Sequence, residues 1–166
     1  ATSLPCAAIP RGRSAGPVFL AASVPRTHAL STPEQEIEAG LIRSAVMALT
    51  HAVLGKRLLV WGGHPSITPI ISLVARAQGI KVESWTRLYQ SRHFSESQIR
   101  ENRYFGNVVF TPDLGSPEAS IVEMRRQMVS DLDFDAAVFL GGGQGVKAEF
   151  DLILHVLDVK GATAGT

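Results

Sequence analysis

The sequence predicts an α/β fold: a doubly wound, mainly parallel sheet of five or slightly more strands, flanked by helices. Three observations support this prediction. Short apolar runs alternate along the chain with stretches in which apolar residues recur at helical spacing. Two of these runs, 58–61 and 136–140, end in glycine-rich turns that lead into helices. The run 136–140 contains no polar residue, as expected for a strand buried on both faces of a parallel sheet.

The length and composition are those of one ordinary globular domain. The chain has 166 residues, of which 45% are hydrophobic and 19% are charged, which is enough to bury a substantial core. Residues 1–16 are rich in proline, glycine and arginine and are expected to form a flexible leader or linker. The predicted single domain therefore covers residues 17–166.

Charge and cysteine content exclude several classes of protein. The longest apolar runs are far shorter than the roughly 18 residues of a spanning helix, so no membrane segment is expected. Sixteen Lys and Arg against 15 Asp and Glu give a net charge of +1, which does not favour duplex nucleic acid as a partner. The single Cys6 excludes an intrachain disulfide and a cysteine zinc cluster, and it indicates a reducing, cytoplasmic setting.

The first predicted strand, 18–22, is followed by a helix with a strong start signal. Thr32, Pro33 and Gln35 supply an N-cap, a proline at the first helical position and a capping-box glutamine. The helix is expected to end at Gly55. Its apolar stripe, predicted to face the core, consists of Ile37, Leu41, Ala45, Leu49 and Val53.

The strand 58–61 and its glycine pair lead into a helix for which Thr68 and Pro69 are the predicted cap and first residue. Residues 80–85 alternate in polarity and predict a half-buried strand. Residues 86–106 interleave basic and aromatic side chains. They are expected to form a short helix and a loop with a solvated basic face, and the alternative is a segment that covers a ligand.

A strand at 108–110 and a helix that starts at Ser116 precede the strand 136–140. The side chains of this helix that are expected to face the core are Ile121, Met124, Met128 and Val129. After the strand 136–140, the glycines at 141–145 open the last helix. A helix N-terminus behind a glycine-rich loop can hold an anion, because its N–H groups lack intrahelical partners and the helix dipole is positive there. A tight turn without a ligand is the alternative.

Ligands of doubly wound folds bind at the carboxyl ends of the strands, where both glycine-rich turns are expected to lie. His64 follows a glycine pair at such an end and is expected to line the pocket. This convergence predicts a nucleotide or phosphate site. The candidate ligand-binding residues are Ser23, Arg26, Gly62, Gly63, His64, Thr111, Gly141, Gly142, Gly143, Gln144, Gly145, Val146 and Glu149.

Other nucleotide and metal motifs do not fit. Gly143, Gly145 and Ala148 match G-x-G-x-x-A, but they follow the last predicted strand instead of the first, which argues against an NAD-dependent dehydrogenase. No Gly-Lys-Ser/Thr triplet occurs, which excludes a P-loop. The absence of H-E-x-x-H and the scattered histidines argue against a zinc hydrolase, so neither a metal nor a cofactor is expected.

The stretch 142–149, GGQGVKAE, resembles the G-G-x-G-T-x-x-E signature of the LOG phosphoribohydrolases and of the wider SLOG superfamily of Rossmann-like nucleotide-binding domains. The stretch 124–128, MRRQM, is similar to the helix that precedes this signature in the LOG enzymes, where an arginine and the signature glutamate act on the glycosidic bond. For an enzyme, the resemblance implies Glu149 and either Arg125 or Arg126 as catalytic residues.

Other parts of the chain are more similar to the SLOG branch of prokaryotic conflict and nucleotide-signalling systems, in which the domain is thought to sense a nucleotide-derived ligand. These parts are the opening VFLAAS at 18–23 and the turn GGHP at 62–65. The resemblance also implies a homo-oligomer, and it leaves open a fused or separate effector domain.

Two positions depart from the hydrolase signature: Gly141 replaces a proline and Val146 replaces a threonine whose hydroxyl can reach phosphate. Backbone amides remain available, so binding survives this loss better than catalysis does. We therefore expect a sensor-type domain that binds a nucleotide or a nucleotide-derived ligand. The alternatives are a LOG-type phosphoribohydrolase that cleaves the N-glycosidic bond of a nucleoside 5'-monophosphate, and a structural or oligomerising domain that binds no ligand.

Overall fold

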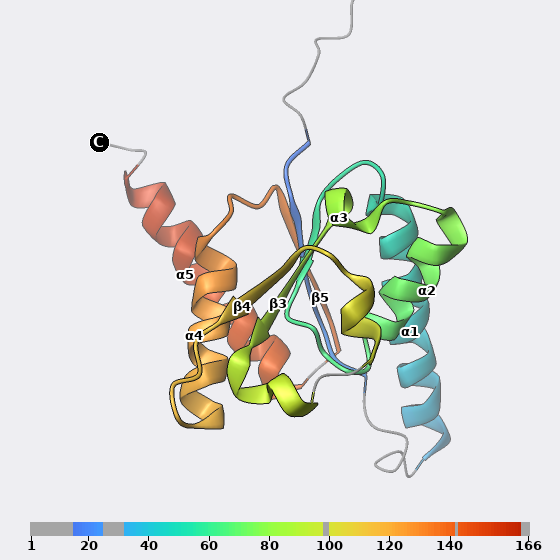
Figure 1. Ribbon diagram of the computed structural model, residues 1–166, viewed down its shortest axis with the longest axis horizontal. Helices are drawn as coiled ribbons and strands as arrows, with labels where there is room; N and C mark the ends of the chain where they lie inside the picture. Colours follow the sequence, from blue (N-terminus) through green and yellow to red (C-terminus); the bar gives the residue numbers. More distant parts are fainter. Residues whose placement is uncertain (1–14, 25–31, 98–99, 142, 164–166) are drawn as a thin grey trace, which may run out of the picture.

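The strands in the described part of the chain form one parallel sheet, in the order β4-β3-β2-β1-β5 (Figure 1). The computed structural model describes residues 15–24, 32–97, 100–141 and 143–163. Its strands are β1 (Val18–Ala22), β2 (Leu59–Trp61), β3 (Thr86–Ser91), β4 (Val108–Thr111) and β5 (Ala136–Leu140). Helices flank this sheet, so the predicted doubly wound α/β fold is confirmed.

The sheet reverses its direction of growth at β1. The chain adds β2, β3 and β4 on one side of β1 and then returns to place β5 on the other side. The backbone continues this pairing past the strand ends, because Ser23 N donates to Leu140 O at 3.1 Å. The carboxyl ends of β1 and β5 therefore form the topological switch point, where ligands bind in open α/β sheets.

Four long helices cover the two faces of the sheet (Figure 1). The helices α1 (Pro33–Val53) and α2 (Thr68–Gln78) pack on one face, and α4 (Pro117–Ser130) and α5 (Gln144–Thr163) pack on the other. The remaining elements are the short helix α3 (Val82–Trp85) and two 3₁₀-helices, η2 (Arg92–Ser97) and η3 (Arg100–Tyr104). No helix in the described ranges is both long enough and apolar enough to cross a membrane.

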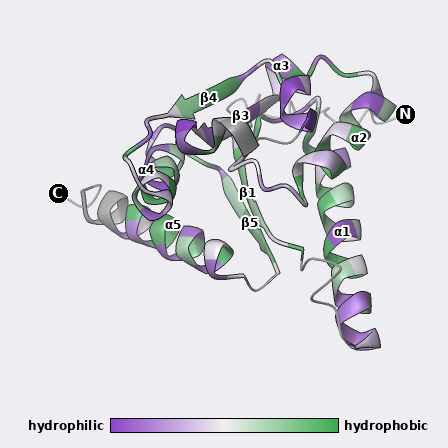
Figure 2. Ribbon diagram, turned by 60° about the horizontal axis from the view of Figure 1, so that its bottom comes forward, coloured by the Kyte–Doolittle hydropathy of each residue, from purple (hydrophilic) through white to green (hydrophobic). Residues whose placement is uncertain are grey.

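Two cores result from the alternation of side chains along the strands. In β1, Val18 and Leu20 point toward the core under α1 and α2, whereas Phe19 and Ala21 point toward the core under α4 and α5. All four are at most 4% exposed. Figure 2 shows hydrophobic colouring along β1 and β5 between the two helix layers. The apolar runs of the sequence are thus buried on both faces, as parallel strands require.

Most predicted helix caps are confirmed, and one is wrong. Thr32 Oγ1 accepts from Gln35 N at 3.4 Å, and Ser116 Oγ accepts from Ala119 N at 3.2 Å. The predicted cap Thr68 has a different role: α2 begins after Ile67 without a side-chain cap, and Thr68 Oγ1 accepts from Trp61 Nε1 at 3.1 Å. This hydroxyl satisfies a buried indole N–H instead of the helix end.

The third strand lies further along the chain than predicted. Residues 82–85 form α3, and the strand is β3, which lies inside the predicted polar segment 86–106. β3 is largely buried despite its polar residues, and hydrogen bonds with nearby and distant residues satisfy several of them. For example, Tyr89 Oη donates to Asp131 Oδ2 at 2.8 Å.

The predicted apolar stripe of α1 is wrong in the first half of the helix, whereas Leu49 and Val53 in the second half do pack against the core. Ile37 and Leu41 are 64% and 65% exposed. The residues that face the core are Ala39, Ile42, Val46, Thr50 and Val53. Thr50 can be buried because its hydroxyl donates to Val46 O at 2.7 Å. Because threonine is polar, the sequence pattern did not identify it as part of the buried face of α1.

Candidate functional site

A cleft of about 560 Å³ lies at the carboxyl ends of β1, β2 and β3 and beside the first turn of α5. The sheet and the loops after its strands contribute Leu20, Ala22, Ser23, Trp61, Gly62, Gly63, His64, Pro65, Ile67, Gln90 and Ser91. The helices around it contribute Phe94, Asn102, Ile121, Met124, Arg125, Gly143, Gln144, Gly145, Val146 and Glu149. Its position at the topological switch point is the one predicted from the glycine-rich turns.

The start of α5 forms one end of the cleft. Residues 143–146 line it, and α5 begins at Gln144. The first hydrogen bond of this helix runs from Lys147 N to Gly143 O, at 3.1 Å. The N–H groups of the residues before Lys147 therefore have no partner within the helix. The positive end of the helix dipole lies at the same place, which favours an anion there.

Gly141 makes the turn from β5 to α5 possible but does not line the cleft. Its φ is +86°, in the region that favours glycine. A Cβ at this position would overlap the backbone carbonyl oxygen of Ser23. Gly141 therefore lets the loops after β1 and β5 approach each other closely, which brings Ser23 next to the start of α5.

Arg125 and Glu149 form an ion pair inside the cleft. Arg125 Nε donates to Glu149 Oε1 at 3.2 Å, and the two side chains are 21% and 12% exposed. Gly145 makes room for this arrangement, because a Cβ there would lie 2.7 Å from Arg125 Nη2. The guanidinium thus lies against the first turn of α5.

The neighbouring Arg126 points elsewhere. It is paired with Glu123 through bonds of 2.8 and 2.6 Å, its side chain is exposed, and it does not line the cleft. Of the two arginines that the sequence left open, Arg125 is therefore the one beside Glu149.

Burial raises the pKa of the Glu149 carboxyl above its usual value, and the charge and hydrogen bond of Arg125 offset this only in part. The folded protein therefore binds this proton more tightly than the unfolded chain does. Ionising Glu149 lowers the free energy of unfolding as the pH rises from the unfolded-state pKa through the folded-state pKa. A partly buried carboxylate with a raised pKa, held by one cation in a cleft, is an arrangement typical of functional sites.

The loop after β2 is fixed by two neighbouring elements. Gly63 has a φ of +65°, and the Gln90 side chain lies where a Cβ of Gly63 would be. His64 Nδ1 lies 2.8 Å from Ser66 Oγ, which in turn accepts from Val24 N at 3.2 Å. The loop after β2 is thus connected to the loop after β1 and to the end of β3, and these segments form the base of the cleft.

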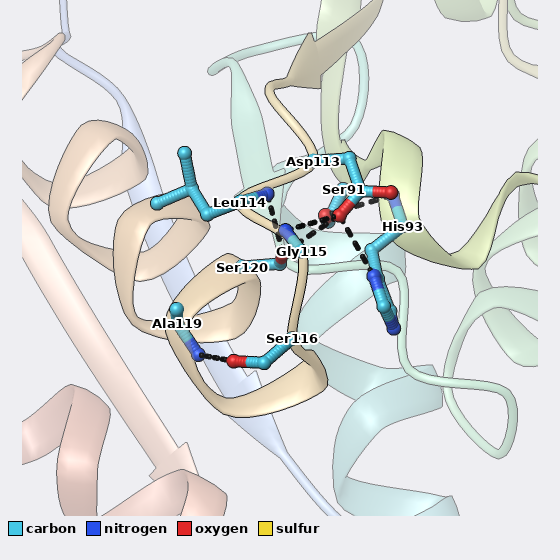
Figure 3. Close-up of polar contacts among 8 residues, drawn as sticks. All are labelled: Ser91, His93, Asp113, Leu114, Gly115, Ser116, Ala119 and Ser120. Carbon is cyan, nitrogen blue, oxygen red and sulfur yellow. Dashed lines mark hydrogen bonds and ion pairs between the residues drawn. The ribbon is translucent and has the colours of Figure 1, made fainter.

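The segment η2 is held against the start of α4 by a polar cluster (Figure 3). His93 Nδ1 lies 2.8 Å from Asp113 Oδ1, and Gly115 N donates to the same oxygen at 2.8 Å. The Gly115 amide and His93 lower the pKa of the Asp113 carboxyl. Leu114 N also donates to Ser120 Oγ at 2.9 Å. The loop before α4 is thus attached to η2 through His93 and to α4 through Ser120.

Some predicted site residues lie away from the cleft. Thr111 is buried at the end of the edge strand β4 and does not line the cleft. Gly141 and Arg126 are exposed and do not line the cleft either. Arg26 and Gly142 lie outside the described residues. Within the described ranges, no three His, Cys, Asp or Glu side chains are close enough to hold a metal ion.

The sequence prediction missed one wall of the cleft, formed by Gln90, Ser91, Phe94 and Asn102. All four fall in the segment 86–106, for which a solvated loop was expected. The exposed side chains of Arg92, Arg100 and Arg103 agree with the expected solvated basic face, whereas the four cleft-lining residues lie where the alternative, a segment that covers a ligand, would place them. The signal was the aromatic residues between the basic ones, because exposed faces rarely need several aromatic side chains.

Gly141→Ala is expected to destabilise the protein more than Gly79→Ala does. Both glycines have positive φ, +86° and +63°, and alanine in this region costs roughly 1–2 kcal/mol. A Cβ at Gly79 would meet no atom within 4 Å, whereas one at Gly141 would overlap the Ser23 backbone. Urea unfolding should show a loss of about 3 kcal/mol or more for Gly141→Ala. Equal losses for the two variants would contradict the close approach.

Comparison with known proteins identifies a family for this chain. Searches of curated proteins and of solved structures find no significant match. The family model that matches is the SLOG cluster3 family, over residues 34–160, a range that begins in α1 and ends in α5. The SLOG resemblance of the glycine-rich signature is thereby confirmed. The chain belongs to the SLOG cluster3 family.

Proposed function

We propose that the cleft binds a nucleotide or a nucleotide-derived ligand and that the domain acts as a sensor of this ligand. The observation that carries the proposal is the meeting of Ser23, Arg125 and the first turn of α5 in one cleft at the topological switch point. Hydroxyl, guanidinium and helix N–H groups are the donors that recognise a phosphate. Membership of the SLOG cluster3 family is consistent with a nucleotide-related function.

The size and composition of the cleft support a ligand larger than a free phosphate. A volume of about 560 Å³ lies in the range typical of small-molecule sites, roughly 300–1,000 Å³. Apolar side chains such as Leu20, Ile67 and Met124 line it together with the polar groups. A ligand with an anionic group and a less polar part, as in a nucleotide, matches this division.

Calorimetry of the unmodified protein tests the proposal. Nucleoside mono-, di- and triphosphates, cyclic nucleotides and dinucleotides should be titrated in turn at moderate ionic strength. We expect at least one of them to bind, and inorganic phosphate to compete with it because it occupies the α5 end of the cleft. Absence of heat for the whole panel, together with an unchanged melting temperature, would remove the proposal.

A second candidate function, hydrolysis of a nucleoside 5'-monophosphate, is favoured by the Arg125–Glu149 pair. In this reaction the bond between C1' of the ribose and the base nitrogen breaks, water adds its oxygen to C1', and the base leaves with a proton. The transition state has oxocarbenium character, which a nearby carboxylate stabilises. Val146, which replaces the threonine of the hydrolase signature, argues for binding without turnover.

Glu149→Gln separates the two candidates. Under the sensor proposal the unmodified protein releases no free base from AMP, and the substitution changes the affinity by about 5-fold, the effect of one hydrogen bond. Under the hydrolase alternative, the unmodified protein releases base, and Glu149→Gln lowers turnover by orders of magnitude with little change in binding. Chromatography after a long incubation with AMP and the other monophosphates measures both outcomes. Base released by the unmodified protein but not by Glu149→Gln would overturn the sensor proposal.

A further inference from the structure

We propose that Gln90, Ser91, Phe94 and Asn102, here called the base wall, form the subsite for the nucleobase of the ligand, while the start of α5 takes its phosphate. This inference rests on the proposed function and adds the orientation of the ligand to it. All four side chains line the cleft, and none of them is charged.

The two ends of the cleft differ in their charged groups and lie far enough apart for a nucleotide. In the base wall, Gln90 and Ser91 end β3, and Phe94 and Asn102 lie in η2 and η3 after it. Arg125 lies against the first turn of α5, which follows β5. In the sheet, β2 and β1 separate β3 from β5. Three inter-strand spacings amount to about 14 Å, which leaves room for a base, a sugar and a phosphate side by side. The neutral end then matches a base, and the end with the Arg125 guanidinium, paired with Glu149, and the positive N-terminus of α5 matches a phosphate.

Hydrogen bonds fix which way the amides of the base wall point. Gln90 Nε2 donates to two backbone carbonyls, Tyr89 O at 2.9 Å and Gly62 O at 3.3 Å. The oxygen of the same amide must therefore be the acceptor, and it accepts from Asn102 Nδ2 at 3.1 Å. This bond in turn fixes the Asn102 amide, so that its Oδ1 is an acceptor at a known position.

Asn102 Oδ1 is the feature of the base wall that indicates a ligand. Asn102 is 4% exposed, and its Oδ1 is buried with no hydrogen-bond partner among the described residues. A buried acceptor without a donor is unfavourable, so a donor is expected to reach it when the cleft is filled. The amide also keeps one Nδ2 hydrogen besides the one given to Gln90. A donor next to an acceptor is what one edge of a nucleobase offers, and asparagine pairs in this way with adenine.

Phe94 supplies the apolar surface of the base wall, and η2 holds it in place. His93 N donates to Ser91 Oγ at 3.2 Å, and His93 Nδ1 contacts Asp113 (Figure 3). Ser95, the residue after Phe94, is exposed. The Arg92 guanidinium lies 5.4 Å from the centre of the Phe110 ring, which attaches η2 to β4. A ring positioned in this way offers a nucleobase a stacking or edge contact.

The experiment compares AMP with ribose 5-phosphate, which lacks the base. We expect Phe94→Ala to weaken AMP binding roughly 5- to 100-fold, the usual effect of losing one base–aromatic contact, and Phe94→Tyr to restore it. Asn102→Ala should weaken AMP binding about 10-fold. Neither variant should change the affinity for ribose 5-phosphate by more than about two-fold, because the phosphate end is untouched. Ser95→Ala and Arg103→Ala, exposed neighbours outside the cleft, serve as matched controls.

The outcomes separate this inference from the proposed function. Unmodified protein that binds AMP no more tightly than ribose 5-phosphate would overturn the base wall and leave nucleotide binding intact. Variants that weaken both ligands equally, or neither, would also overturn it, since the side chains would then act on the fold or not at all. Circular dichroism of each variant identifies a folding defect, and Phe94→Tyr tests the wall without removing the ring. If the unmodified protein binds neither probe nor any nucleotide, both proposals fail.

Discussion

Gly143→Val is expected to abolish nucleotide binding, with a loss of at least about 100-fold. Gly143 lines the cleft immediately before α5, and a Cβ there would already lie 3.2 Å from Ser23 Oγ. The two methyl groups of valine would extend into the space between Ser23 and the helix N-terminus. A phosphate could then not reach the backbone N–H groups, and the loss of two charge-assisted hydrogen bonds at roughly 1.5–3 kcal/mol each gives this factor.

Gly40→Val is the matched control for this prediction. Gly40 lies in α1, where a Cβ would meet no atom within 4 Å, and it is far from the cleft-lining residues in sequence. The same substitution there should leave the nucleotide affinity unchanged. It should also leave α1 intact, because valine has a higher helix propensity than glycine. Calorimetry of both variants, with thermal unfolding to confirm that they fold, checks the prediction. A folded Gly143→Val protein that keeps full affinity would show that phosphate does not bind at the start of α5.

Arg125→Ala is expected to weaken nucleotide binding by about 100-fold, whereas Arg126→Ala should leave it unchanged. Arg125 is the only Lys or Arg among the described residues that line the cleft. Its removal deletes a charge-assisted contact with the phosphate and leaves the Glu149 carboxylate without its cation, so that the remaining charge repels the ligand. Arg126 is adjacent in sequence but is exposed and paired with Glu123, which makes it a matched control.

The effect of Arg125→Ala should also depend on pH. Burial raises the pKa of Glu149 and Arg125 lowers it, so the pKa should rise further in the variant. As the pH falls through this pKa, Glu149 becomes protonated and its repulsion of the phosphate is lost. The affinity defect of Arg125→Ala should therefore shrink toward acidic pH. Titrations at several pH values measure this, and equal defects for Arg125→Ala and Arg126→Ala at neutral pH would contradict the assignment of Arg125 to the site.

The sequence was sufficient where structure depends on local signals. The apolar strands 18–22 and 136–140, the cap residues Thr32 and Ser116, and the two glycine-rich turns are recognised from a few adjacent residues. Together with the order of the elements, they predict the sheet and the edge at which the cleft lies. This is because the carboxyl ends of parallel strands share one edge whatever the details of packing.

The sequence was insufficient where a side chain depends on a distant partner. β3 contains Arg87 and Gln90, so its sequence does not resemble that of a buried strand. Only the structure shows that the Gln90 amide is hydrogen-bonded to Gly62 O and to Asn102 Nδ2. Likewise, Arg125 and Arg126 are adjacent on a helix and point about 100° apart, so a difference of one residue decides which enters the cleft. Only the packing of α4 against α5 makes that choice.

The most direct test of nucleotide binding in the cleft is a two-dimensional amide NMR titration of the 17.8 kDa protein with the nucleotide that calorimetry selects. The proposal predicts that the largest shifts occur at Ser23, at residues 143–149 and at Phe94, with small shifts along the outer face of α1. Shifts confined to residues outside the cleft, or a spectrum that does not change at saturating nucleotide, would contradict it.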